Sequence, residues 1–136
     1  MANFSKEDAK KVFEEKMNDY KEEDAQKVFN NWDAIYDKLK SNAIFGKLLD
    51  DAIDLYNMLK DYYNDKYTEV PVGTIGAIVV ALLYIFSPID VIPDFIPFAG
   101  LIDDALVLTI CLEFVGSDLD KYRKWRKAMQ KNNEEI

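Results

Sequence analysis

The chain of 136 residues contains no histidine and a single cysteine, Cys111. Without histidine there is no His-based catalytic triad, no His-ligated zinc and no imidazole general base. A single cysteine excludes an intrachain disulfide framework and favours a reducing, intracellular setting. The sequence also lacks a glycine-rich phosphate loop and cysteine pairs at metal-ligand spacing. These absences disfavour most familiar enzyme classes, so we expect a non-enzymatic role and leave an enzymatic one open.

Positive charge is also scarce, since the net charge is −8 and the arginines number two, Arg123 and Arg126. A general nucleic-acid binder needs a surplus of basic residues to neutralise phosphates, so we expect no nucleic-acid partner. The first 19 residues are polar and acidic and lack the apolar core of a secretory signal. The sequence therefore predicts a cytoplasmic protein and leaves association with a membrane open.

Apolar residues make up 49% of the chain, enough for one domain over residues 1–136 with its own core. Residues 1–65 show apolar residues at helical spacing, which predicts three amphipathic helices. The first follows Ser5, which with Asp8 resembles a capping box. The second covers Lys21 to Leu39, and the third starts at Ser41 or Asn42 and extends to Tyr63. With the segments that follow, this pattern predicts an all-α fold, a compact bundle of five to six helices.

The segment from Val70 to Ile89 contains no charged residue. A helix that is apolar on all sides is either the centre of a protein or a membrane span, and about 20 residues suffice for a span. Pro71 and Pro88 limit the regular helix to residues 72–87. Both interpretations therefore stay open, a buried central helix or an integral membrane protein. A stripe of small residues would let a neighbouring backbone approach this helix closely in either case: Gly73, Ala77 and Ala81.

Two further helices are predicted near the C-terminus. Residues 101–115 form a largely apolar helix that ends at Gly116, and Cys111 lies in it as a buried, inert thiol. Residues 117–134 form a last helix that carries six basic residues together with Tyr122 and Trp125. We expect this to be a solvated basic face that balances the acidic N-terminal half, and the alternative is a face that meets an anionic membrane surface.

Between these apolar helices lies a segment rich in aspartate and proline. Residues 87–97 read S-P-I-D-V-I-P-D-F-I-P, and residues 100–104 read G-L-I-D-D. Ionised carboxylates in an apolar stretch need a hydrogen bond, a counter-charge or a metal ion. In one interpretation all four carboxylates cap helices or turns. Ser87 and Pro88 then start a helix that has one carboxylate in its first turn, and the other carboxylates cap turns and the start of the next helix. The four carboxylates belong to Asp90, Asp94, Asp103 and Asp104.

Two functional interpretations compete with capping. The carboxylates of Asp90, Asp94 and either Asp103 or Asp104 could converge on Mg²⁺ or Ca²⁺, which prefer oxygen ligands, and serve phosphate chemistry there. Alternatively, the cluster is paired with an arginine, the usual partner of a desolvated carboxylate. This second interpretation predicts that the last helix folds back and brings Arg123 or Arg126 to the cluster.

The same run of residues resembles the YkvA-like domains, a bacterial family with the signature S-P-x-D-x-x-P-D-x-x-P…G-x-x-D-D. The resemblance covers residues 70–112, about a third of the chain, and leaves residues 1–65 outside it. It implies a helical domain, often described as membrane-associated, without an established activity. We therefore expect an accessory or interaction module that acts near a membrane or with a protein partner and needs no cofactor. A carboxylate-based Mg²⁺ or Ca²⁺ site is the alternative, and the oligomeric state stays open.

Overall fold

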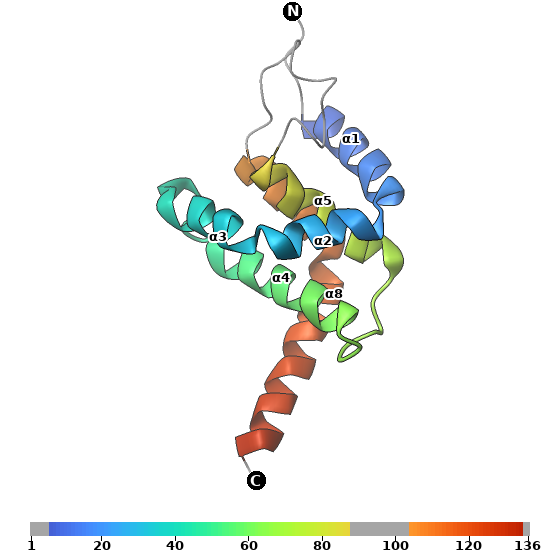
Figure 1. The fold of residues 1–136 in the computed structure, drawn as a ribbon, viewed down its shortest axis with the longest axis vertical. Coiled ribbons are helices and arrows are strands. Elements are labelled where there is room, and N and C mark those ends of the chain that lie inside the picture. Colours follow the sequence, from blue (N-terminus) through green and yellow to red (C-terminus); the bar gives the residue numbers. More distant parts are fainter. Residues whose placement is uncertain (1–5, 88–103, 135–136) are drawn as a thin grey trace, which may run out of the picture.

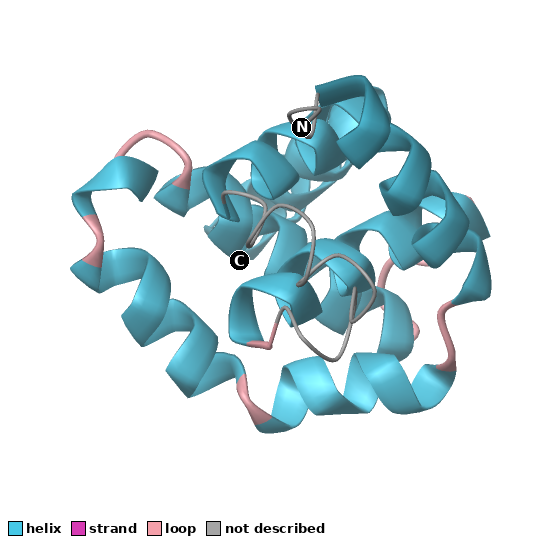
Figure 2. Cartoon of the chain, turned by 90° about the horizontal axis from the view of Figure 1, so that it is seen from above, coloured by secondary structure: helices cyan, strands magenta, loops and turns pink. Residues whose placement is uncertain are grey.

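The computed structural model describes residues 6–87 and 104–134, and this part of the chain is built of helices joined by loops (Figures 1 and 2). The predicted all-α fold is confirmed. The described elements are α1 (Lys6–Asp19), α2 (Glu22–Asn30), α3 (Trp32–Ser41), the 3₁₀ turn η1 (Ala43–Phe45), α4 (Leu49–Tyr63), α5 (Val72–Phe86) and α8 (Asp104–Glu134).

Helix α5 lies at the centre of the described bundle, in agreement with the first of the two interpretations of the uncharged segment. Every residue from Thr74 to Ile85 is buried, and the helix contacts α1, α2, α3, α4 and α8 (Figure 1). Full burial of one such aliphatic side chain stabilises the fold by roughly 1.5–3 kcal/mol. Within residues 6–87 and 104–134, none of the helices combines the length and the apolar character that a bilayer-spanning helix needs.

Helix α1 approaches α5 closely at Gly76, one residue away from Ala77 of the predicted small-residue stripe. A Cβ atom at Gly76 would lie 2.1 Å from the backbone oxygen of Met17 in α1. Ala77 of the stripe meets α8, because the thiol of Cys111 donates to its backbone oxygen at 3.5 Å. Small residues therefore let two helices approach the backbone of α5 closely, α1 at Gly76 and α8 at Ala77.

The single helix predicted over Lys21–Leu39 is wrong, because the chain breaks at Asn31 into α2 and α3. The side-chain amide of Asn31 donates to the backbone oxygen of Lys27 at 2.7 Å, and its backbone N–H also bonds the last turn of α2. An asparagine that satisfies carbonyls at a helix end competes with continued helix. The third helix also begins later than predicted, at Leu49, after the short turn η1.

The predicted helix end at Gly116 is wrong as well, since α8 continues unbroken from Asp104 to Glu134. A glycine in a helix interior costs only about 1 kcal/mol relative to alanine. Buried side chains on both sides of it, Val115, Leu119 and Tyr122, lie on one face of the helix and pack into the core. Their burial outweighs the cost of Gly116, so the apolar and the basic segments form one helix.

Candidate functional site

The helices that flank the aspartate- and proline-rich segment are joined by a lysine from α3. The ammonium of Lys38 donates to the backbone oxygen of Ile85 in the last turn of α5 at 2.6 Å. It also lies 3.3 Å from Oδ2 of Asp104, the first residue of α8. A cation at the C-terminal end of a helix satisfies a carbonyl and meets the negative end of the helix dipole. Lys38 thereby links the C-terminal end of α5 to the N-terminal end of α8, two helices that pack directly on each other.

Most residues of the signature cluster lie outside the described part of the chain. Ser87 is described: it follows α5, its backbone N–H donates to Leu83 at 2.8 Å, and its own backbone is extended. The helix start predicted at Pro88 and the carboxylates of Asp90, Asp94 and Asp103 lie outside the described residues. Within residues 6–87 and 104–134, no group of three or more potential metal ligands comes together. The proposed Mg²⁺ or Ca²⁺ site therefore stays a prediction.

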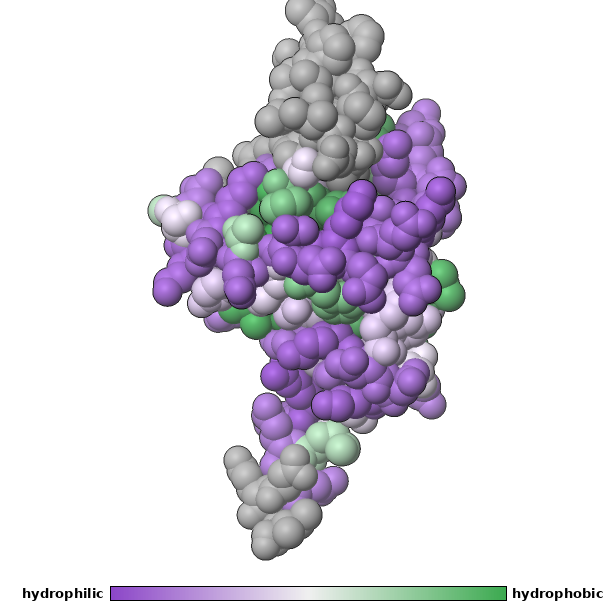
Figure 3. Space-filling model, in the orientation of Figure 1, coloured by the Kyte–Doolittle hydropathy of each residue, from purple (hydrophilic) through white to green (hydrophobic). Residues whose placement is uncertain are grey.

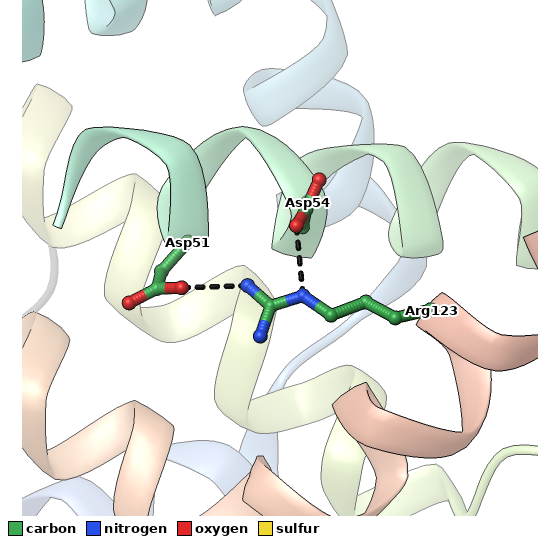
Figure 4. A network of polar contacts seen from close by, with 3 residues as sticks. All are labelled: Asp51, Asp54 and Arg123. Atoms are coloured by element: carbon green, nitrogen blue, oxygen red, sulfur yellow. Dashed lines mark hydrogen bonds and ion pairs between the residues drawn. The ribbon is translucent and has the colours of Figure 1, made fainter. Parts of the chain in front are cut away.

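Arg123 folds back from α8 onto two carboxylates of α4 (Figure 4). Its Nη2 donates to Asp51 at 2.6 Å and its Nε donates to Asp54 at 2.8 Å. Burial lowers the pKa of the guanidinium, but the hydrogen bonds to both carboxylates outweigh this effect and the pKa lies above its usual value. The pairing predicted for Arg123 or Arg126 with Asp90, Asp94, Asp103 or Asp104 stays a prediction, and the ion pair described above for Asp104 is with Lys38.

Sequence reasoning missed the partners of Arg123. Asp51 and Asp54 are three residues apart on one face of α4, but acidic residues recur throughout the first 65 residues. Nothing in their spacing distinguishes these two from the solvated ones. The pairing fixes α8 against α4, and the two elements also contact each other elsewhere along their lengths.

Tyr122 adds a second polar contact between α8 and α4. Its hydroxyl donates to Oδ2 of Asp61 at 2.6 Å, and its buried ring packs on Tyr67 and Trp125 at centroid distances of 5.2 and 5.8 Å. Burial, followed by the hydrogen bond to Asp61, raises the pKa of Tyr122. This aromatic cluster packs α8 against the segment that follows α4, next to the part of α8 that projects.

Stability at high pH should depend on Tyr122. Its raised pKa means that the folded protein keeps the phenolic proton above pH ~10, where the unfolded chain loses it. Fewer bound protons in the unfolded state make the free energy of unfolding fall as pH rises, by at most about 1.4 kcal/mol per pH unit for one group. Its contribution is thus fully present below pH ~10 and declines above it. We expect Tyr122→Phe to make this decline less steep in urea melts between pH ~9 and ~11.5. Identical pH slopes for the two proteins would contradict the assignment.

The C-terminal half of α8 projects beyond the other helices, at the end of the molecule away from α1 (Figure 1). Side chains from Lys127 to Asn132 are all exposed, and this end of the surface is largely hydrophilic (Figure 3). Six of the 17 basic residues but only two of the 25 acidic residues lie in residues 121–136, which therefore carry a net +4, against a net −12 for the preceding 120 residues. The charge of the sequence is thus polarised between the acidic first 120 residues and the basic C-terminal half of α8, of whose six basic residues Lys127 and Lys131 lie in the projecting part.

Cys111 is fully buried, as predicted, and burial raises the pKa of its thiol well above the ordinary value. A thiol in this state is a poor nucleophile and a poor metal ligand. Helix α8 therefore contributes buried side chains to the core, Cys111 among them, and charged side chains to the surface.

The fold and these sites define a class of small all-α domain in which one uncharged helix is enclosed by amphipathic ones. The family described as "Protein of unknown function (DUF1232)" matches residues 74–110. Over 80 residues the chain is 38% identical to the "Uncharacterized membrane protein YkvA" of Bacillus subtilis (strain 168), which covers 59% of this chain and 76% of that relative. The chain belongs to this YkvA-like family of unknown function. No solved structure matches the chain.

Proposed function

We propose that the protein is a non-enzymatic module that docks on an anionic membrane surface through the basic end of α8, residues 121–134. The observation that carries this proposal is the segregation of charge, a net +4 in the last 16 residues of a chain with a net charge of −8. Basic residues close to an anionic bilayer each contribute about 1 kcal/mol of attraction.

The geometry of α8 supports docking by its end. Residues 127–134 extend over about 12 Å at 1.5 Å per residue. This length exceeds the Debye length of about 8 Å at physiological ionic strength. The projecting stretch therefore holds Lys127 and Lys131 at a bilayer while the acidic body stays more than a Debye length away, and the other four basic residues of α8 lie nearer the body, within residues 121–126. Met129, which is 44% exposed, adds an apolar side chain at this end.

The similarity to a protein named as a membrane protein also supports the proposal. A protein partner with an acidic surface is the competing possibility, because it would meet the same cations. The two differ in that only the first predicts binding to pure lipid.

Sedimentation with vesicles tests the proposal. We expect the protein to sediment with phosphatidylcholine vesicles that contain phosphatidylglycerol, and to stay in solution with phosphatidylcholine alone. Because the attraction is electrostatic and exposed, raising the salt concentration to about 0.5 M should release the protein. Equal binding to neutral and anionic vesicles, or binding to neither, would contradict membrane docking by α8.

A further inference from the structure

An open groove of about 540 Å³ lies between α4 and the projecting half of α8. Its polar lining includes Asp54 and Asn57 from α4 and Arg123, Arg126, Lys127 and Gln130 from α8. This volume lies in the range of small-molecule sites and accommodates a phosphate group with its immediate substituents. The groove lies at the base of the surface that we propose for membrane docking.

The charges in this groove do not cancel. Arg123 donates to Asp54 at 2.8 Å and to Asp51, which does not line the groove, at 2.6 Å, so its positive charge is already paired. Arg126 is half-buried, and within residues 6–87 and 104–134 it has no ion-pair partner. Lys127 is exposed beside it. Of the charged residues that line the groove, Arg123, Arg126 and Lys127 are positive and Asp54 is negative, so the lining carries a net charge of +2.

The types of donor in the groove match a phosphate group. A guanidinium binds two phosphate oxygens with parallel hydrogen bonds, and an ammonium adds a compact positive charge. The side-chain amides of Asn57 and Gln130 can each donate to further oxygens. Arg123 is held in place by Asp51 and Asp54 (Figure 4), which fixes the wall of the groove beside Arg126.

We propose that this groove binds one phosphate group, with Arg126 as its principal ligand and Lys127, Asn57 and Gln130 as supporting donors. The proposal deepens the proposed function, on which it rests for its lipid source: the phosphate is the headgroup of an anionic lipid, and α8 docks by holding it. The same chemistry would also bind free phosphate, so the test has one arm for each source.

The lipid arm compares two variants that each remove one positive charge from α8. Arg126→Gln removes the groove ligand, whereas Lys124→Gln removes an exposed lysine that does not line the groove. On vesicles containing phosphatidic acid, Lys124→Gln should weaken partition about fivefold, as expected for loss of one cation. Loss of a two-bond guanidinium–phosphate contact should make Arg126→Gln roughly 50-fold weaker. Arg126→Lys, which keeps the charge, should still bind several-fold more weakly than the wild type.

The second arm titrates the protein with inorganic phosphate and follows the side-chain amide signals of Asn57 and Gln130 by NMR. We expect a saturable shift that Arg126→Gln abolishes and Lys124→Gln retains. Thermal melts confirm that both variants are folded.

The two arms separate failure of the groove from failure of membrane docking. Equal vesicle losses for both variants, without a saturable phosphate shift, would overturn the groove and leave docking intact. The groove would be assigned to free phosphate if the NMR shift with inorganic phosphate depended on Arg126 while the protein did not bind vesicles. The same assignment would follow if that shift depended on Arg126 but Arg126→Gln and Lys124→Gln lost equal amounts of vesicle binding. Neither vesicle binding nor a phosphate shift would overturn both proposals.

Discussion

Gly76→Ala is expected to lower the free energy of unfolding by about 3 kcal/mol, the upper part of the range for overpacked cores. The added Cβ would lie 2.1 Å from the backbone oxygen of Met17 and 2.9 Å from the ring of Tyr20. Because the first of these atoms belongs to the backbone of α1, a side-chain rotation cannot relieve the contact, and α1 must shift away from α5. Thermal melts should show a midpoint lower by about 10 °C for a domain of this size, and urea melts should show a lower midpoint concentration.

Gly116→Ala is the matched control for this change. Gly116 also lies in a helix interior, but a Cβ atom there would meet nothing within 4 Å. Alanine is about 1 kcal/mol more favourable than glycine in a helix, so we expect Gly116→Ala to raise the free energy of unfolding by about 0.5–1 kcal/mol. If Gly76→Ala were as stable as Gly116→Ala, α1 would not cross α5 at this glycine. A destabilising Gly116→Ala would argue against a continuous α8.

The second large effect concerns the exposed lysines of the projecting helix. Replacing Lys121, Lys124 and Lys131 together with glutamine should weaken binding to anionic vesicles by about 3 kcal/mol, or roughly 100-fold. All three side chains are exposed, so the melting temperature should change little. Partition measured against phosphatidylglycerol content gives the affinity, and the groove residues Arg126 and Lys127 stay intact in this variant.

The control variant carries the same charge change on the body of the protein. Lys11, Lys47 and Lys66 are also exposed and lie outside α8. Their replacement with glutamine brings the net charge to the same value, but we expect the loss of vesicle binding to be several-fold at most. Equal losses for the two triple variants would mean that net charge, rather than the end of α8, governs binding.

The sequence predicted the centre of this fold well because the signal there is physical and local. Twenty residues without a charge have few stable environments, and burial of α5 follows once amphipathic helices are available to cover it. The helix breaks were harder to predict. Apolar residues keep helical spacing through Asn31, where a side-chain hydrogen bond ends α2. Gly116 resembles a helix end, but α8 continues through it because residues beyond it pack on residues distant in sequence, as Tyr122 does on Asp61 and Tyr67.

The contacts between distant residues could not be predicted from one sequence. Lys38 is one of many exposed lysines, and its place between Ile85 and Asp104 depends on how α3 crosses the ends of α5 and α8. That Arg123 pairs with Asp51 and Asp54 depends in the same way on how α4 packs against α8. The aspartate- and proline-rich signature was recognised from its residues, but its role as caps, metal ligands or arginine partners stays a prediction.

The central claim, that the end of α8 is the part of the molecule that meets the bilayer, is tested most directly with a fluorophore sensitive to its environment. Cys111 is fully buried and its thiol pKa is raised, so a cysteine introduced at an exposed position can be labelled selectively. We would label Met129→Cys in α8 and, separately, Ala34→Cys on the exposed side of α3. With vesicles containing phosphatidylglycerol, the account predicts a blue shift and stronger emission at position 129 and no change at position 34. A change at position 34 alone, equal changes at both, or no change at either would contradict it.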